Sequence, residues 1–251
     1  MNKFEELVHK EFNLWGELSS KVEYNSYKCL INKELKGSKS GFFNLALKAN
    51  NSQIHIESEL ESIELLYKEE ESLGNIIIQN ENLNKKFDVV EDGEYFYTKS
   101  ELIDLNKLSE KISITETDDI DSFAKTLSNG FGYDKSFEEG FVNRMKGIRS
   151  KLDCKFYLLY SDGKSISCAS YFRMKGIDDY CLMNCATINE YKRRGYLSTL
   201  LNYSLNMIKS PVFTRTNNPD MMKLLEKNNF LSGGKFKVVT IESALENYEQ
   251  K

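Results

Sequence analysis

The stretch Tyr180–Leu201, which reads YCLMNCATINEYKRRGYLSTLL, predicts the fold of the C-terminal half of the chain. It begins with an apolar segment, Tyr180–Thr187, that is typical of a buried strand. After a short turn comes the basic, glycine-centred segment Lys192–Leu197. A helix is expected directly behind it, from Ser198 onward, because apolar residues recur there at helical spacing.

This strand, loop and helix together predict an anion-binding site. At a helix N-terminus the free backbone N–H groups and the positive end of the helix dipole point to the same place. Arg193 and Arg194 add positive charge to the loop, and a guanidinium fork matches phosphate oxygens. Because Gly195 has no side chain, it lets the backbone approach a ligand closely. We therefore expect the loop to hold a phosphate-bearing ligand.

The same segment resembles the acyl-CoA pyrophosphate loop of the GCN5-related N-acetyltransferases (GNAT), whose pattern is Arg/Gln-x-x-Gly-x-Gly/Ala. Lys192 stands at the first position and Gly195 at the fourth, whereas Leu197 departs from the Gly or Ala of the family. The segment before the loop, Ala186–Tyr191, is similar to the family's strand end Ala-Val-x-Pro-x-Tyr, with Thr for Val and Asn for Pro.

A second segment, Asn218–Phe230, keeps the spacing of the family's Asn-x-x-Ala-x-x-Leu-Tyr-Glu-Lys-x-Gly-Phe. The positions that match are Asn218, Leu224, Glu226, Lys227 and Phe230, and those that depart are Met221, Leu225 and Asn229. The resemblance covers roughly residues 112–241. It implies the GNAT acyl-CoA N-acyltransferase fold, an α/β fold with a mixed sheet.

The N-terminal half resembles the second half of the same domain in a degraded form. A strand at Phe42–Leu47, a helix from Ser52 to Ser72 and a strand at Asn75–Gln79 repeat the order found around the glycine loop. We therefore expect two domains, a degenerate GNAT-like domain at 1–105 and a GNAT acetyltransferase domain at 111–251. The first copy has Lys48–Ser52 where the loop would be, with no glycine and no arginine, so we infer that it holds no pyrophosphate and has a structural or substrate-covering role.

Several further elements are expected from local patterns. They are a helix over 2–20 continued by helix or loop to about Lys39, a turn at 83–86, strands at 87–90 and 94–98 joined by an Asp92-Gly93 turn, a polar connector at 100–111, helices at about 118–128 and 136–149, a hairpin closed by Asp162-Gly163, and a last strand at 235–241 after a Gly233-Gly234 turn.

The resemblance implies acetyl-CoA as cofactor, with the loop on the pyrophosphate and the end of the central strand paired with the pantetheine amides. The residues implied in cofactor binding are Cys185, Ala186, Thr187, Lys192, Arg193, Arg194, Gly195, Tyr196, Leu197, Ser198, Asn218 and Leu225. In this family the helix–loop–helix near the start of the domain borders the acceptor site. Phe131, Tyr133 and Glu138 are therefore candidates for substrate binding, beside the simpler interpretation of a capped helix start with solvated glutamates.

No catalytic residue is assigned. The family's frequent general-acid Tyr corresponds to Leu225, its early-strand Glu to about Cys181, and the C-terminal domain contains no His. A general acid or base contributes about 10²–10⁴-fold in rate, so its loss does not exclude acetyl transfer. Two functions thus remain open: an N-acetyltransferase acting on an amine of a small molecule or peptide, and a non-catalytic acyl-CoA-binding sensor or regulatory module.

Composition narrows the partners. The net charge of −4 and the lack of a basic stripe interleaved with aromatics disfavour nucleic acid. No apolar run is long enough for a membrane span, and the first residues do not form a signal peptide. The five cysteines are odd in number and have no Cys-x-x-Cys spacing, which indicates reduced thiols in a cytoplasmic protein and no metal site. Strand alternation predicts that Cys181 and Cys185 face the same side. The oligomeric state is left open.

Overall fold

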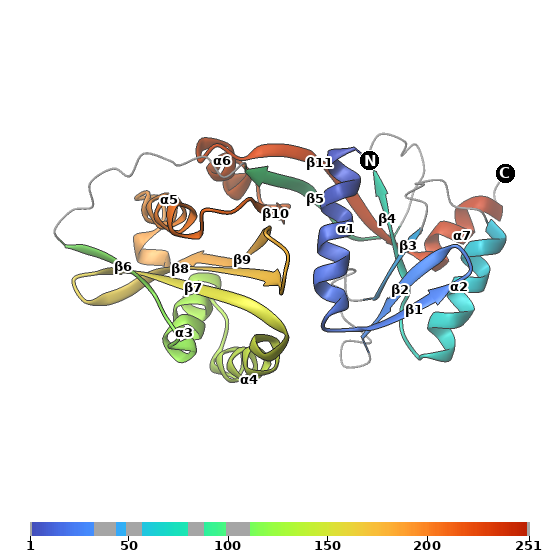
Figure 1. Cartoon of the computed structure of the whole chain (residues 1–251), viewed down its shortest axis with the longest axis horizontal. Helices are drawn as coiled ribbons and strands as arrows, with labels where there is room; N and C mark the ends of the chain where they lie inside the picture. The colour runs from blue at the N-terminus through green and yellow to red at the C-terminus, as the bar shows by residue number, and fades with distance from the viewer. Residues whose placement is uncertain (1, 33–43, 49–56, 80–87, 99–110, 250–251) are drawn as a thin grey trace. The chain divides into compact units, whose positions relative to one another are not determined.

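The computed structural model describes residues 2–32, 44–48, 57–79, 88–98 and 111–249 (Figure 1). The first two residues of the strand expected at Phe42–Leu47, the turn at 83–86 and most of the connector at 100–111 lie outside these residues. The chain divides into two compact units. Unit 1 comprises Met1–Tyr95, Arg215–Asn218 and Ser232–Lys251, and unit 2 comprises Phe96–Thr214 and Pro219–Leu231.

Unit 2 is a mixed sheet with helices on both faces. Its strand order is β10-β9-β8-β7-β6, all antiparallel except the parallel pair β9–β10, and the end of β5 lies beside β10. The predicted mixed α/β fold is therefore confirmed. The elements are β6 (Ile112–Glu116), α3 (Ile120–Phe131), α4 (Lys135–Lys151), β7 (Leu152–Ser161), β8 (Lys164–Met174), β9 (Tyr180–Thr187), a 3₁₀ turn η4 (Asn189–Tyr191), α5 (Tyr196–Ile208), β10 (Val212–Thr216) and α6 (Pro219–Lys227).

Alternating side chains give the unit 2 sheet an apolar surface on each side. On one face Tyr171, Leu182 and Leu201 belong to a single buried cluster, which seats α5 on the sheet. On the other face Phe156 packs edge-on against Phe123 of α3, with ring centroids 5.0 Å apart. The sheet is thus held rigidly between helices, which is the support that a precise site requires.

Unit 1 repeats part of this arrangement. Its strand order is β1-β2-β3-β4-β11, with β3 parallel to β4 and the other pairs antiparallel. A buried carboxylate, Glu11, is satisfied by Trp15 Nε1 at 3.0 Å, the Tyr95 hydroxyl at 2.7 Å and Arg215 Nε at 2.7 Å. The elements are α1 (Lys3–Gly16), β1 (Ser20–Tyr24), β2 (Tyr27–Ile31), β3 (Leu45–Lys48), α2 (Glu57–Glu69), β4 (Asn75–Gln79), β5 (Val89–Thr98), β11 (Leu231–Thr240) and α7 (Ile241–Glu249).

The two units share one motif. In unit 1, β3, α2 and β4 form strand, helix and parallel strand, as β9, α5 and β10 do in unit 2. β5 follows β4 along the chain and lies mostly in unit 1, with its end beside β10, whereas β11 follows α6 in the second half of the sequence and pairs with β4. Each compact unit therefore draws on both halves of the sequence. The division into two related domains, 1–105 and 111–251, stays a prediction.

Two local expectations in the N-terminal half are wrong. Residues 20–31 form the hairpin β1–β2, in which Tyr24 pairs with Tyr27, where helix or loop was expected. Strand β5 runs straight through Gly93, where a turn was expected. A Cβ at this position would lie 2.8 Å from the Thr216 carbonyl oxygen, so the residue has to be a glycine for the two backbones to come this close. Here glycine allows close backbone approach and does not mark a turn.

The end of the chain also differs from expectation. Strand β11 already begins at Leu231 and includes Gly233 and Gly234, where a turn was predicted. A Cβ at Gly233 would lie 2.3 Å from Leu7 Cδ1, so this glycine makes room for α1. After the strand, Ile241–Glu249 forms helix α7, which the charged composition of that segment did not indicate.

Candidate functional site

The central strand β9 of unit 2 contains a bulge. Met183 pairs with Ser170 and Ala186 pairs with Cys168, so β9 has one residue more than β8 between these two pairs. Asn184 takes up the extra residue with a positive φ of 49°. A bulge bends its strand and locally increases the twist. The second half of β9 therefore runs in a different direction from the first half.

The sheet opens beside this bulge. Strand β10 pairs with β9 only at Val212–Tyr180 and Phe213–Cys181, and a single side-chain bond follows, from Thr214 Oγ1 to the Leu182 carbonyl at 2.9 Å. Within the described residues, the rest of β9 up to Thr187 has no β10 partner. An opening of this kind leaves one edge of a strand ready to pair with an extended amide chain. We call it the β9–β10 slot.

The glycine loop follows the open end of the slot. Gly195 is the N-cap residue of α5 with φ 84°, and no side chain caps this helix. The first N–H groups of a helix have no intrahelical partners. A Cβ placed on Gly195 would meet no atom within 4 Å, so space for a ligand lies directly against the backbone. The positive end of α5 therefore faces open space at Gly195.

The basic residues of the loop have different roles. Arg193 is 90% exposed and lies 3.8 Å from Asp220, and its own φ is positive at 62°. Arg194 lies over the Tyr191 ring, 5.6 Å from the centroid, and the Tyr191 and Tyr196 rings are 6.0 Å apart. Both arginines remain on the surface and are free to turn toward an anion. Tyr191 and Tyr196 are held in packing contacts and are not assigned to proton transfer.

Lys192 ties the loop to helix α3. Its Nζ donates to the Gly130 carbonyl oxygen at 2.9 Å. The same glycine touches the strand end, since a Cβ on it would lie 2.6 Å from the Ala186 Cβ and 3.2 Å from the Thr187 carbonyl oxygen. The structure thus brings the end of α3 against the end of β9 and the glycine loop, two neighbouring segments that are distant from α3 in sequence.

The acceptor candidates lie on the last of these segments. Phe131 ends α3, and Gly132 caps the helix in the left-handed conformation at φ 75°. Phe131 and Tyr133 are 53% and 51% exposed and stack with centroids 5.4 Å apart. Glu138 lies in the first turn of α4 and is half-buried. The two exposed rings thus follow Gly130, which packs on the end of β9.

The remaining cofactor candidates divide into two groups. Ser198 Oγ donates to Asn228 Oδ1 at 2.9 Å, which ties the first turn of α5 to the residue that follows α6. Leu225 is completely buried in the core, so the position of the family's tyrosine offers packing and no hydroxyl. Tyr196 and Leu197 also pack against that core. Asn218 is exposed and belongs to unit 1.

The cysteine prediction is corrected by the bulge. Cys181 pairs with Phe172, on the opposite face from Tyr171 and Leu182, whereas Cys185 packs against the cluster that contains Tyr171 and Leu182. The extra residue reverses the alternation, so the two thiols face opposite sides. Although Cys185 is partly exposed, burial around its sulfur raises the pKa of the thiol to about 12. It is protonated at neutral pH and is not a thiolate nucleophile.

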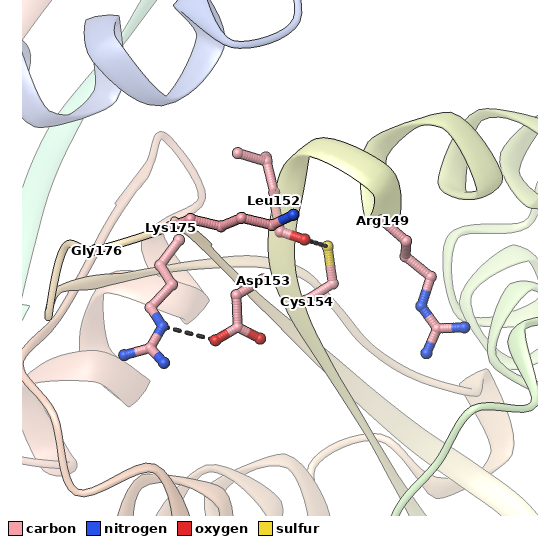
Figure 2. Close-up of a pocket in the computed structure, with 7 residues that line it drawn as sticks. Arg149, Leu152, Asp153, Cys154, Lys175 and Gly176 are labelled. Atoms are coloured by element: carbon pink, nitrogen blue, oxygen red, sulfur yellow. Dashed lines mark hydrogen bonds and ion pairs between the residues drawn. The ribbon is translucent and has the colours of Figure 1, made fainter.

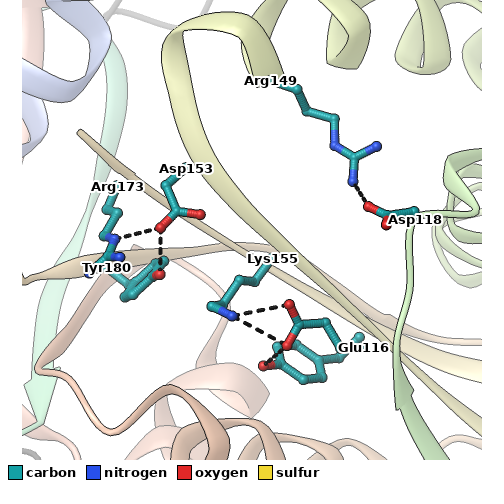
Figure 3. Close-up of polar contacts among 8 residues, drawn as sticks. Glu116, Asp118, Arg149, Asp153, Lys155, Arg173 and Tyr180 are labelled. Atoms are coloured by element: carbon teal, nitrogen blue, oxygen red, sulfur yellow. Dashed lines mark hydrogen bonds and ion pairs between the residues drawn. The ribbon is translucent and has the colours of Figure 1, made fainter. Parts of the chain in front are cut away.

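A polar cluster that the sequence did not reveal lies at the start of β9 (Figure 3). Asp153 Oδ2 accepts from Arg173 Nε at 2.7 Å and from the Tyr180 hydroxyl at 2.8 Å. Arg173 also lies over the Tyr180 ring, 4.5 Å from the centroid. Burial opposes ionisation of Asp153, but the bonds from Tyr180 and Arg173 prevail and lower its pKa. Burial and the carboxylate raise the pKa of Tyr180.

A second polar group lies next to it on β6 and β7. Glu116 accepts from Lys155 Nζ at 3.0 Å and from the Tyr157 hydroxyl at 2.9 Å. Burial first, and then this bond, raise the pKa of Tyr157, so its proton stays in place at neutral pH. Figure 3 shows the two clusters side by side, and alternation places Asp153, Lys155 and Tyr157 on one face of β7.

Comparisons with known proteins agree with this geometry at the level of fold. A GCN5-related N-acetyltransferase from Kribbella flavida superposes with a TM-score of 0.68 at 8% identity, covering 96% of each chain. A functionally unknown conserved protein from Staphylococcus epidermidis gives 0.62 at 13% identity, covering 88% of this chain and 93% of that one. A tandem GNAT protein from the clavulanic acid biosynthesis pathway gives 0.56 at 11% identity, covering 86% and 78%.

Because the sequence identities are low, these structural similarities establish the fold and nothing more. No known protein family matches the sequence, and no curated protein does either. The chain has the fold of the GCN5-related N-acetyltransferases, and its neighbours include a tandem protein of that fold, as the sequence predicted. In the part of the chain that the structure describes, no helix is both long enough and apolar enough to cross a bilayer.

Proposed function

We propose that this protein is an N-acetyltransferase that uses acetyl-CoA and acts on an amine of a small molecule or peptide. The observation that carries the proposal is the β9–β10 slot leading to the uncapped N-terminus of α5 at Gly195. A ligand with a long amide arm and a pyrophosphate at its end needs both features: the slot for the arm and, beyond the end of the same strand, the helix N-terminus for the pyrophosphate. The GNAT fold of the chain agrees with this chemistry.

The cradle at Gly195 fits the pyrophosphate of CoA. The first N–H groups of α5 would donate to its oxygens, helped by the helix dipole. Arg193 and Arg194 are exposed beside it and would supply charge-assisted bonds. The residues Cys185, Ala186 and Thr187 at the end of β9 would pair with the amide arm. Lys192 already bonds the Gly130 carbonyl, so its contribution is to fix the loop against α3.

When bound, acetyl-CoA supplies the acetyl thioester. The acceptor nitrogen forms a new bond to the carbonyl carbon of the acetyl group, and the carbon–sulfur bond breaks. The amine loses one proton, and the departing sulfur gains one and leaves as the CoA thiol. The chain contributes chiefly position, which converts a bimolecular step into a step within one complex and is worth about 7–11 kcal/mol in favourable cases. The family resemblance implies an acceptor beside Phe131 and Tyr133, which are exposed at the end of α3.

One observation favours a second function, a non-catalytic acyl-CoA-binding sensor or regulatory module. Leu225 stands where the family has a tyrosine, and its side chain is completely buried in the core and provides no hydroxyl group. A sensor of this kind would bind acetyl-CoA by the same loop and strand but would release no thiol. For either function, we propose that the protein is cytoplasmic.

A thiol-release assay separates the two functions. The protein would be incubated with acetyl-CoA and a panel of amines, and free CoA would be measured with a thiol reagent. The enzyme proposal expects acceptor-dependent release that Gly195→Glu lowers strongly at limiting acetyl-CoA and Gly163→Glu does not. Gly163 is a matched control because its φ of 77° is also positive and a Cβ there also meets no atom within 4 Å. Cofactor binding without release for every amine tested would favour the sensor.

A further inference from the structure

A pocket of about 510 Å³ opens in unit 2 at the start of the central strands (Figure 2). The end of α4, the start of β7 and the turn after β8 form its walls. The residues that matter for its chemistry are Arg149, Asp153, Cys154, Arg173 and Lys175. The pocket contains none of the residues that the sequence singled out for cofactor or acceptor.

Its charged groups form an arrangement of three cations and one carboxylate, and most are already held in place. Arg173 is fixed by the Asp153 carboxylate and the Tyr180 ring, as described above. Lys175 Nζ donates to the Ser150 carbonyl oxygen at 3.2 Å. Arg149 forms an ion pair with Asp118 at the edge of the pocket. Because these side chains are already ordered, a ligand would lose little freedom in engaging them.

The position of the pocket relates it to the β9–β10 slot. Tyr180, the first residue of β9, donates to Asp153 on the pocket wall. The pairing of β9 with β10 begins at the same residue and ends after Cys181, so the slot closes just beside the pocket. The glycine loop lies at the other end of β9, roughly 23 Å away at about 3.3 Å per residue. A ligand anchored at the loop and extended along β9 therefore brings its far end toward this pocket.

We propose that this pocket, at the opposite end of β9 from Phe131 and Tyr133, receives the acceptor in their place, and that the acceptor is a small zwitterionic amine, one that carries a carboxylate close to its amino group. The inference rests on the proposed acetyl transfer. Arg173 and Lys175 bind the carboxylate of the acceptor, since a charged donor and a charged acceptor form the stronger kind of hydrogen bond.

Asp153 orients the amino group. Both of its bonds in the structure end on Oδ2, and Oδ1 takes part in neither (Figure 3). An ammonium group bonded to Oδ1 would lie next to the Tyr180 hydroxyl, at the closed end of the slot. The amine loses its proton to solvent before it attacks. Asp153 is thus a positioning residue, and its ionised form is the one that the cluster stabilises.

Binding of free amino acids tests the proposal without acetyl-CoA. The probes are the free amino acids, each paired with its α-carboxamide, which keeps the amine and removes the carboxylate. Binding to the full-length protein would be followed by calorimetry or by protein NMR shifts. We expect at least one amino acid to bind and its carboxamide to bind at least tenfold more weakly.

Three variants locate the site. Lys175→Gln and Arg173→Lys should each weaken binding of that amino acid at least tenfold; Arg173→Lys keeps the charge but loses the planar fork that matches a carboxylate. The matched control is Lys146→Gln, which removes the same charge from an exposed position of α4 that does not line the pocket, and it should bind as the wild type does. Circular dichroism confirms that each variant is folded.

The outcomes separate this inference from the proposed function. Equal binding of each amino acid and its carboxamide, no binding of any, or equal loss in Lys146→Gln would overturn the zwitterion site. A failure of acetyl-CoA to bind at the loop would instead remove the transferase, and the amino acid measurement would still report on the pocket. With both sites working, the preferred amino acid should release CoA thiol at least tenfold faster than its carboxamide.

Discussion

The substitution Gly195→Glu tests the anion cradle most sharply, because the structure separates its effect on folding from its effect on binding. A Cβ at this position meets no atom within 4 Å, so nothing in the protein has to move. The remaining cost to stability comes from the φ of 84°, which a non-glycine residue tolerates at about 1–2 kcal/mol. The variant should fold, with a moderately lowered midpoint of unfolding.

The effect on acetyl-CoA binding should be larger. A carboxylate about 4 Å from a phosphate charge is repelled by about 4 kcal/mol at an effective dielectric constant near 20. If solvent screening halves this value, about 2 kcal/mol remains, which is a loss of roughly 30-fold in affinity at 1.4 kcal/mol per tenfold. Displacement of the phosphate from the helix N–H groups adds to that loss.

Calorimetric titration of acetyl-CoA into the wild type, Gly195→Glu and Gly163→Glu gives the answer. Both variants replace a positive-φ glycine in open space, at φ 84° and 77°, so they share the same strain and added charge. Only Gly195→Glu should lose affinity for acetyl-CoA. An affinity in Gly195→Glu within threefold of the wild type would refute the reasoning that the N-terminus of α5 holds the pyrophosphate.

Three further outcomes follow from the contacts described. Leu225→Ala should lower the free energy of unfolding by about 2–5 kcal/mol, because the side chain is fully buried, and a loss below 1 kcal/mol in urea unfolding would contradict that packing. Lys192→Met should remove the bond to the Gly130 carbonyl and lower the rate of thiol release more than the stability, and an unchanged rate would show that the loop needs no such tie. The pKa of Asp153 is lowered in the folded state, so its stabilising effect is present above the unfolded pKa of about 3.9 and is lost as the pH falls through the folded pKa. Asp153→Asn should therefore reduce stability at pH 7 and have a smaller effect at pH 2.5; an equal effect at both would deny the pairing with Arg173.

The fold of unit 2 could be predicted because its signals are local. The strand Tyr180–Thr187 and the helix behind Gly195 each follow from hydrophobic periodicity, and Asp162-Gly163 closes the β7–β8 hairpin as a two-residue turn. The capping role of Asp119 was also predictable, since its side chain accepts from the Ser122 N–H at 2.9 Å. Such patterns need no knowledge of distant contacts.

The pairing of β11 with β4 and the bulges could not be predicted in this way. Counting outward from the hairpin, with Ser161 opposite Lys164, pairs Asp153 with Phe172. A register shift between Leu159 and Tyr160 moves the partner to Arg173 and so creates the ion pair. The bulge at Asn184 likewise reverses the faces of the cysteines. Each irregularity shifts the strand pairing by one residue, and the residue types at these positions do not reveal the shift in the sequence.

The structural role of a glycine is also difficult to predict from the sequence. At Gly93 the patterns predicted a turn, but the strand continues and the missing side chain lets the Thr216 carbonyl approach. Gly130 likewise makes room for Ala186, which brings α3 to the candidate site. Close approach and turn formation both select glycine, and a single sequence does not tell them apart.

The measurement that tests the central claim most directly is the thermal unfolding midpoint of the wild-type protein with acetyl-CoA, free CoA and ATP at matched concentration. A ligand at 100 times its dissociation constant adds about 2.7 kcal/mol of stability, which is easily seen as a raised midpoint. The account predicts a rise with both CoA species that is much smaller in Gly195→Glu, and none with ATP. No rise with either CoA species would contradict it, because the slot and the loop would then be features of the fold without the ligand for which they are proposed.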